Sequence, residues 1–157
     1  MIIQFILHGK TEDRYLQEGI SKYLKRVEHY ISFKEIIIPS IKNAKSLTFS
    51  EIKQKEGEIL RTKIKTSDFV VLLDENGIEF SSIDFSDFLQ QKMNQSTKSI
   101  VFVVGGAYGF SSEVYQRANY KLSISKMTFS HQMIRLLFIE QIYRAFTILN
   151  NEPYHHQ

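Results

Sequence analysis

The chain has no cysteine, no tryptophan and only two prolines among its 157 residues. The lack of cysteine excludes disulfides, thiol nucleophiles and thiolate zinc sites, and it is typical of a reducing compartment. The longest apolar runs, at residues 2–7, 69–73, 100–104 and 134–139, fall short of the roughly 20 residues that cross a bilayer. The N-terminus lacks the basic flank and small-residue cleavage site of a signal peptide. We therefore expect a cytoplasmic protein that has no contact with a membrane.

A large excess of one charge is also missing, since the formal net charge is +3 and the pI is about 9.0. This mild basicity favours an anionic partner without establishing one. Hydrophobic residues make up 43% of the chain and aromatic residues 13%, which excludes a disordered or fibrous chain. No repeat, low-complexity segment or linker divides the sequence, so we predict a single domain over residues 1–157.

Apolar patterning predicts strands and helices that alternate five times. The strands are expected at residues 2–8, 35–38, 68–73, 99–104 and 121–125. The helices are expected after an N-cap at Thr11, after a capping box formed by Thr48 and Glu51, at 82–94, from Ser111 or Ser112 to Ala118, and at 130–149. Continuous apolar strands joined by helices indicate an α/β fold with a mostly parallel sheet covered on both faces.

The last of these helices is apolar around nearly its whole circumference. Between residues 133 and 139 only Arg135 is polar, so the helix needs cover on more than one side. A subunit interface would supply that cover in a small domain, and we therefore predict a homodimer. The alternative is a central core helix.

Two loops that follow predicted strands could carry chemistry. Gly105-Gly106-Ala107-Tyr108-Gly109 comes directly after a buried strand, where open α/β sheets bind ligands. Its spacing matches neither the dinucleotide fingerprint nor a Walker motif, and a tight turn is the alternative. Asp74-Glu75 ends another strand and could meet a ribose hydroxyl or a cationic substrate, but the following Asn76-Gly77 favours a solvated turn.

The segment 123–132 is a polar loop with apolar anchors at Ile124, Met127 and Phe129, which suits a nucleoside. The alternative is a loop packed by its own side chains. His131 and Arg135 lie one helical turn apart and could face a phosphate or a base together.

The C-terminal end of the chain offers weaker signals. Glu140 and Arg144 have the spacing of a surface ion pair. Tyr154 and His155 suit stacking on a nucleobase, with a frayed terminus as the alternative. No carboxylate stands at ligand spacing from the histidines, so no metal site is expected.

Four segments together resemble one known family: residues 103–109, 122–132 apart from Ser130, 139–146 and 152–155. They are similar to the RlmH family of the SPOUT superfamily, and the resemblance extends over essentially the whole chain. It implies a SPOUT fold with a C-terminal trefoil knot and a homodimer. It also implies that S-adenosylmethionine is the methyl donor and that N3 of a pseudouridine in 23S ribosomal RNA of the assembled ribosome is the acceptor.

Two other functions stay open, namely a SPOUT methyltransferase for another RNA position or tRNA, and a non-catalytic RNA-binding or ribosome-assembly module. By residue, the resemblance implies cofactor contacts at Leu73, Gly105, Ile124, Ser125, Lys126, Met127, Thr128 and Phe129. It implies RNA contacts at His131, Arg135, Arg144, Tyr154 and His155, with His155 as the candidate catalytic residue. Where the family commonly has proline, this chain has Ser130, a good N-cap.

Overall fold

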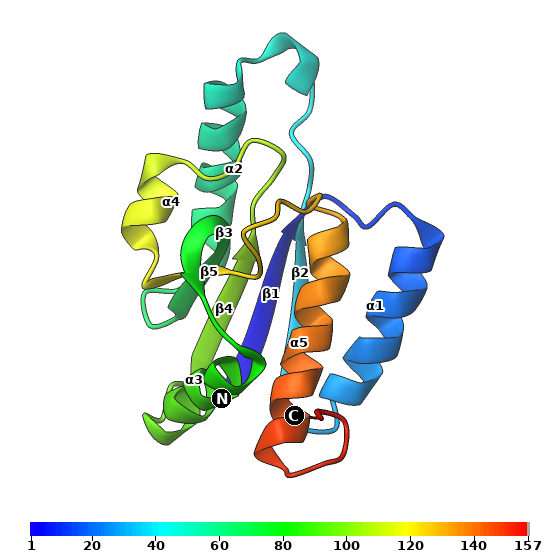
Figure 1. Ribbon diagram of the computed structural model, residues 1–157. Helices are drawn as coiled ribbons and strands as arrows, with labels where there is room; N and C mark the ends of the chain where they lie inside the picture. Colours follow the sequence, from blue (N-terminus) through cyan, green and yellow to red (C-terminus); the bar gives the residue numbers. More distant parts are fainter. Residues whose placement is uncertain (157) are drawn as a thin grey trace.

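The computed structural model describes residues 1–156 and contains one five-stranded sheet (Figure 1). Its strand order is β2-β1-β4-β3-β5, and every pairing is parallel. The strands are β1 (Ile2–His8), β2 (Ser32–Ile38), β3 (Phe69–Glu79), β4 (Ser99–Val104) and β5 (Tyr120–Ser123). The predicted α/β class is therefore confirmed, and the carboxyl ends of all five strands meet at one edge of the sheet.

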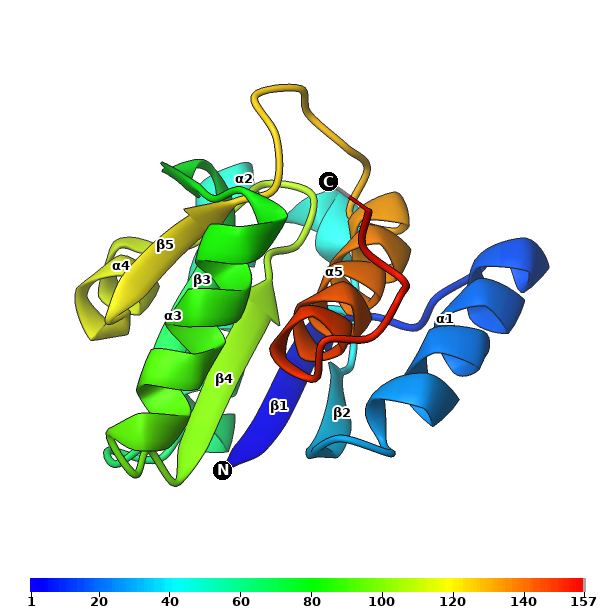
Figure 2. The ribbon, with the colours of Figure 1, turned by 60° about the horizontal axis from the view of Figure 1, so that its bottom comes forward.

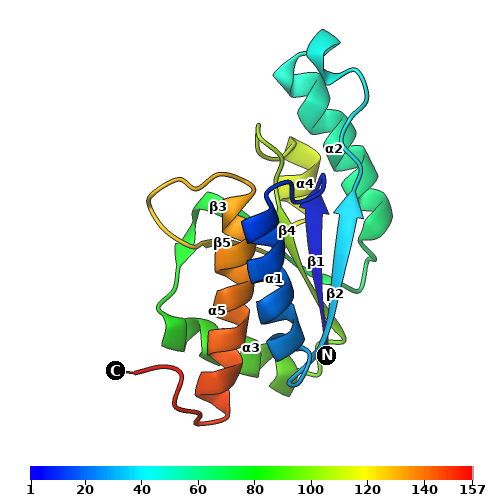
Figure 3. The ribbon, with the colours of Figure 1, turned by 90° about the vertical axis from the view of Figure 1, so that its right-hand side faces the viewer.

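Helices cover both faces of this sheet (Figures 2 and 3). One face carries α1 (Arg14–Val27), α3 (Ser82–Asn94) and α5 (Met133–Leu149), and the other carries α2 (Phe49–Lys63) and α4 (Ser112–Arg117). The larger hydrophobic core lies under the first three helices and includes Phe5, Phe102 and Phe138. A smaller core, with Leu60 and Val114, lies under the other two.

Helix α5 lies between α1 and α3 over the middle of the sheet (Figure 2). Its Phe138, Ile139 and Ile142 are fully buried within the single chain. The sheet and the two neighbouring helices thus cover most of its apolar surface, as the core-helix alternative expects. Met133 and Leu137, four residues apart on one side of α5, stay partly exposed.

The N-terminal ends of α1 and α2 can be compared with the caps predicted from the sequence. The capping box is confirmed, because the Thr48 hydroxyl accepts from the Glu51 N–H at 3.2 Å and the Glu51 carboxylate accepts from the Thr48 N–H at 2.7 Å. The N-cap predicted at Thr11 is wrong. Helix α1 begins at Arg14 after Asp13, and the Thr11 hydroxyl instead accepts from Arg135 of α5 at 3.1 Å.

Strand β3 runs on through the turn that the sequence favoured at residues 74–77. It pairs with β5 on both sides of an irregularity between Leu73 and Ile78. A Cβ on Gly77 would lie only 2.6 Å from the backbone carbon of Leu122, so this position excludes every larger residue. Asn76 still makes a local turn contact, since its N–H donates to Asp74 Oδ1 at 2.8 Å.

Other boundaries also differ from prediction. Strand β2 begins at Ser32 rather than 35, and the start of β5 and the end of α4 differ by one residue. Strand β5 ends at Ser123 rather than 125, and α5 begins at Met133 rather than 130. The connecting loop is correspondingly longer. Within residues 1–156, no helix combines the length and apolar character needed to cross a membrane.

Candidate active site

The irregular middle of β3, at residues 73–76, and the loops that follow β4 and β5 line one cavity at the carboxyl edge of the sheet. Its volume is about 590 Å³, within the usual range of roughly 300–1,000 Å³ for small-molecule sites. Residues 73–76, 104–110, 122–125 and 127–131 contribute to its wall, together with Tyr115 and Ile134. Three segments that are distant in sequence are therefore brought together, as parallel strands require.

Seven of the eight predicted cofactor residues line this cavity: Leu73, Gly105, Ile124, Ser125, Met127, Thr128 and Phe129. Lys126 does not. Its side chain is 88% exposed, and its Nζ lies 3.9 Å from Glu79 Oε2 on the outer side of the loop. The ammonium group of Lys126 therefore lies outside the cavity wall.

The glycine loop is supported from behind by α2. A Cβ on Gly106 would lie 2.5 Å from a carboxylate oxygen of Glu56, which rises from α2 beneath the loop. The Glu56 side chain is only 14% exposed and lies 4.0 Å from His8 Nδ1. Because Glu56 fills the space on one side of Gly106, a larger residue at this position would require the Glu56 carboxylate to shift.

The loop between β5 and α5 is held in shape by its own polar side chains. The Met127 N–H donates to Ser125 Oγ at 2.9 Å, and the Thr128 hydroxyl donates to Glu75 Oε2 at 2.9 Å. Within residues 1–156, the backbone N–H groups of Lys126, Thr128 and Phe129 donate to no protein acceptor. Thr128 and Phe129 line the cavity, so their backbone N–H groups are donors that suit the polar edge of a nucleobase.

Asp74 and Glu75, for which the sequence favoured a solvated turn, belong to the cavity wall. The Tyr115 hydroxyl from α4 donates to Asp74 Oδ2. Burial, and then this hydrogen bond, raise the pKa of Tyr115 to about 12, so its proton stays in place at neutral pH. The strand-end position could have identified Asp74 and Glu75. No sequence signal identified Tyr115, because its place depends on how α4 packs.

His131 lines the cavity, whereas Arg135, one turn further along α5, does not. Burial, and then the charge of Arg135, lower the pKa of His131, which favours its neutral form.

Arg135 is 1% exposed, and its guanidinium donates to the carbonyl oxygens of His8 at 2.7 Å and Gly9 at 3.0 Å. It also donates to the carbonyl oxygen of His131 at 3.0 Å. These contacts argue against the prediction that Arg135 faces RNA, because the side chain is buried and four of its five N–H groups donate inside the protein.

Ser130 is not the N-cap of α5, a position that Gln132 takes, but it shapes the turn just before the helix. Its hydroxyl accepts from the Met133 N–H at 3.1 Å, and its carbonyl accepts from the Ile134 N–H at 3.1 Å. The serine therefore closes the turn that leads into α5 without the rigidity of a proline.

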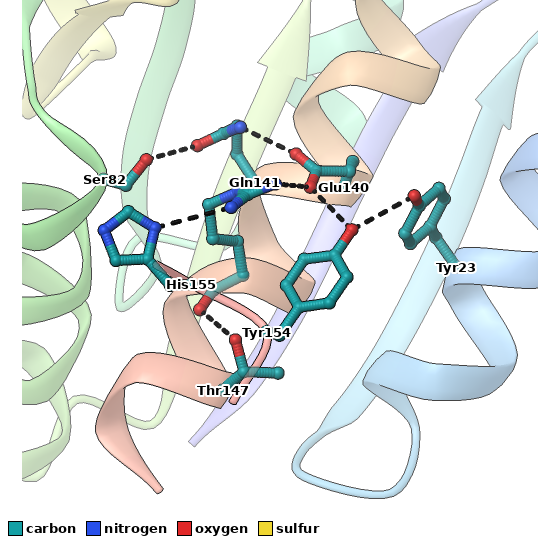
Figure 4. Close-up of polar contacts among 8 residues, drawn as sticks. Tyr23, Ser82, Glu140, Gln141, Thr147, Tyr154 and His155 are labelled. Atoms are coloured by element: carbon teal, nitrogen blue, oxygen red, sulfur yellow. Dashed lines mark hydrogen bonds and ion pairs between the residues drawn. The ribbon is translucent and has the colours of Figure 1, made fainter. Parts of the chain in front are cut away.

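The C-terminal tail folds back onto α5 rather than fraying (Figure 4). Arg144 and Glu140 form the expected ion pair at 2.7 Å. The Tyr154 hydroxyl donates to Glu140 Oε1 at 3.0 Å, and the His155 Nδ1 lies 3.4 Å from Arg144 Nη1. Burial, and then hydrogen bonds with Tyr23 and Glu140, raise the pKa of Tyr154.

This polar cluster of the tail lies away from the cavity of the same chain. Neither Tyr154 nor His155 belongs to the cavity wall. Arg144, which contacts His155, is ten residues along α5 from Ile134 at the cavity, or about 15 Å. Within one chain, the predicted RNA-contacting residues thus fall into two separate groups.

Comparisons with known proteins agree with this arrangement. The family model described as "Predicted SPOUT methyltransferase" matches residues 1–155. Among solved structures, a probable methylase family protein from Haemophilus influenzae is similar, with a TM-score of 0.52 at 12% identity. That similarity covers 95% of this chain and 66% of the other chain, and at such low identity it supports the fold alone.

Relatives with much higher identity cover the full length. Proteins named "Ribosomal RNA large subunit methyltransferase H" from Christiangramia forsetii, Parabacteroides distasonis and Flavobacterium johnsoniae are 55%, 56% and 56% identical over 157 residues. Each alignment spans 100% of both chains. The chain therefore belongs to the RlmH family of SPOUT methyltransferases. The trefoil knot that the resemblance implies stays a prediction.

Proposed function

We propose that this protein transfers a methyl group from S-adenosylmethionine to N3 of a pseudouridine in 23S ribosomal RNA of the assembled ribosome. The observation that carries the proposal is end-to-end identity of 55–56% with proteins named ribosomal RNA large subunit methyltransferase H. The single cavity that gathers seven predicted cofactor residues supports it. A ribosomal substrate is also consistent with action in the cytoplasm.

S-adenosylmethionine supplies an activated methyl group when it is bound. The unused backbone N–H groups of residues 126, 128 and 129 would hold its adenine, beside the apolar surface of Ile124. Asp74 and Glu75, also in the cavity wall, are suited to its ribose hydroxyls or its ammonium group. The close packing of Gly106 on Glu56 would keep the third loop in place beneath the cofactor.

The acceptor N3 must lose a proton before or during attack on the methyl group, so the site needs a proton acceptor near the target base. We propose His155 for the contact with the target base, with Tyr154, Arg144 and His131 as further RNA contacts. His155 contacts Arg144, which lies about 15 Å along α5 from Ile134 at the cavity of the same chain, and this separation supports a homodimer in which the partner's tail completes the site. The partly exposed side of α5 with Met133 and Leu137 is the surface available for that contact.

The test is incubation of the purified protein with methyl-labelled S-adenosylmethionine and intact ribosomes, half of them lacking the relevant pseudouridines. Label should enter large-subunit RNA only when pseudouridine is present. Label in both samples, or label in added tRNA instead, would move the activity to another RNA position. No label together with no cofactor binding would leave a non-catalytic RNA-binding or ribosome-assembly module.

The role of the tail is tested by His155→Ala, which lies in a partly exposed segment and should leave folding intact. The variant should lose methyl transfer while retaining cofactor affinity. Sedimentation of the wild-type protein should show a dimer. Undiminished methylation by the variant removes His155 from the site.

A further inference from the structure

Two exposed aromatic rings stack on each other beside the cavity. Phe49, the first residue of α2, and Tyr108, from the glycine loop, have ring centroids 4.1 Å apart and planes inclined by 19°. Phe49 is nevertheless 64% exposed and Tyr108 42% exposed. Since Tyr108 covers one face of the Phe49 ring, much of that exposure belongs to the opposite face. The stack is therefore open to a further planar group.

The position of this pair relates it to the candidate active site. Tyr108 lines the cavity, and Phe49 extends the aromatic surface outward from it. The N-terminal turn of α2 projects beyond the carboxyl edge of the sheet (Figures 1 and 3). Anything that reaches the cavity over the glycine loop passes this pair of rings.

The surrounding chain is basic. Between residues 39 and 55 there are four lysines, Lys42, Lys45, Lys53 and Lys55, and a single acid, Glu51. Glu51 is occupied by the capping box with Thr48. Lys53 stands one helical turn from Phe49, at a spacing that places both on the same side of α2. An open aromatic face next to lysines matches the two requirements of single-stranded nucleic acid, a stacking surface for bases and cations for phosphates.

We propose that Phe49 and Tyr108 form a stacking platform for an unpaired nucleobase of the RNA substrate, next to the nucleotide that enters the cavity. This inference rests on the proposed function and adds an RNA contact on the opposite side of the cavity from α5. The lysines favour RNA over an apolar protein surface as the occupant. No part of the cofactor is required for the contact, because the open face points outward.

The experiment compares Phe49→Leu, which keeps apolar volume but removes the ring, with Phe49→Trp, which keeps an aromatic face. Tyr15→Leu is the matched control, because Tyr15 is a 60% exposed aromatic residue on α1, on the other face of the sheet. Two quantities are measured for each variant. One is KM for intact ribosomes, and the other is the fluorescence quenching of a 2-aminopurine base in a single-stranded RNA oligonucleotide.

Phe49→Leu should raise KM about tenfold, abolish the quenching and leave the affinity for S-adenosylmethionine within twofold of wild type. Phe49→Trp should retain both wild-type values, and Tyr15→Leu should change neither. The proposal is overturned if Phe49→Leu keeps the wild-type KM, or if the wild-type protein does not quench the oligonucleotide. A rise in KM with unchanged quenching would instead indicate a protein contact on the ribosome. If wild-type protein quenches the oligonucleotide but methylates no ribosome, the proposed function fails while the platform stands.

Discussion

Arg135 offers the sharpest test of how this fold positions its site. Its buried guanidinium joins the N-terminal turn of α5 to the loop that follows β1, through the carbonyl oxygens of His131, His8 and Gly9 and the hydroxyl of Thr11. Replacement by methionine keeps the unbranched shape of the side chain but replaces the guanidinium with an apolar end. It removes all four hydrogen bonds and leaves their acceptors without a donor.

The expected cost follows from these contacts. A hydrogen bond contributes about 1 kcal/mol net, so the loss of four of them costs about 4 kcal/mol. We therefore expect Arg135→Met to lose about 4 kcal/mol of unfolding free energy. For a chain of this length, about 2–4 °C of melting temperature accompany each kcal/mol, so Tm should fall by roughly 8–16 °C.

Urea unfolding followed by circular dichroism measures this loss, and Arg144→Met is the matched control. Arg144 has the same chemistry, but its side chain is 26% exposed and it pairs with a single carboxylate, so about 1 kcal/mol is expected. The variant Arg135→Met should also bind S-adenosylmethionine more weakly, because Arg135 holds the residue where the cofactor loop enters α5. A loss below about 1.5 kcal/mol, or equal losses for the two variants, would refute the reasoning.

Three further outcomes can be measured by the same unfolding assay. Gly77→Ala should lose about 2–3 kcal/mol, because its Cβ would meet the rigid backbone of Leu122, and a wild-type midpoint would contradict the close approach. Thr48→Ala should lose about 1 kcal/mol of unfolding free energy, because it removes the capping box. Asp13→Ala should lose clearly less, because the Asp13 side chain makes no cap hydrogen bond, and equal losses would argue against capping. Burial, and then the charge of Arg135, lower the pKa of His8 to about 4 from 6.5, so the unfolded chain binds the proton more readily between these values. The unfolding free energy is thus retained above pH 6.5 and falls as the pH drops toward 4, by up to about 3 kcal/mol relative to His8→Gln. Parallel pH profiles of unfolding free energy for the wild type and His8→Gln would contradict this role of His8.

Local patterns predicted the elements of this fold well. Residues 2–8 and 99–104 are apolar runs bounded by polar residues or glycine, and the structure ends β1 and β4 at the same positions. The capping box at Thr48 was also predictable, because a cap depends only on residues three apart. Thr11 had the same kind of local signal, yet a contact with a residue more than 120 positions away determines its role.

The cavity shows the same division between local and long-range information. The glycine loop and the loop after β5 could each be predicted as ligand-binding, because both follow apolar strands of a parallel sheet. The strand-end position pointed to Asp74 and Glu75 but could not separate a cavity wall from a solvated turn, since their place in the wall depends on β5 and α4 lying next to β3. The sequence could not distinguish a buried Arg135 from an RNA-binding arginine. Arg135 is one helical turn from His131, which does reach the cavity, so its spacing alone suggested the same role.

The sequence by itself determined the α/β class, the five strands, most helix positions and, through its resemblance, the RlmH family. These follow from short-range periodicity and from motifs that are contiguous along the chain. Only the tertiary structure decided the strand order β2-β1-β4-β3-β5, the burial of Arg135, the distance between the tail and the cavity, and the stack of Phe49 on Tyr108. The physical reason is that each depends on which distant segments pack together, and neither propensity nor spacing along the chain carries that information.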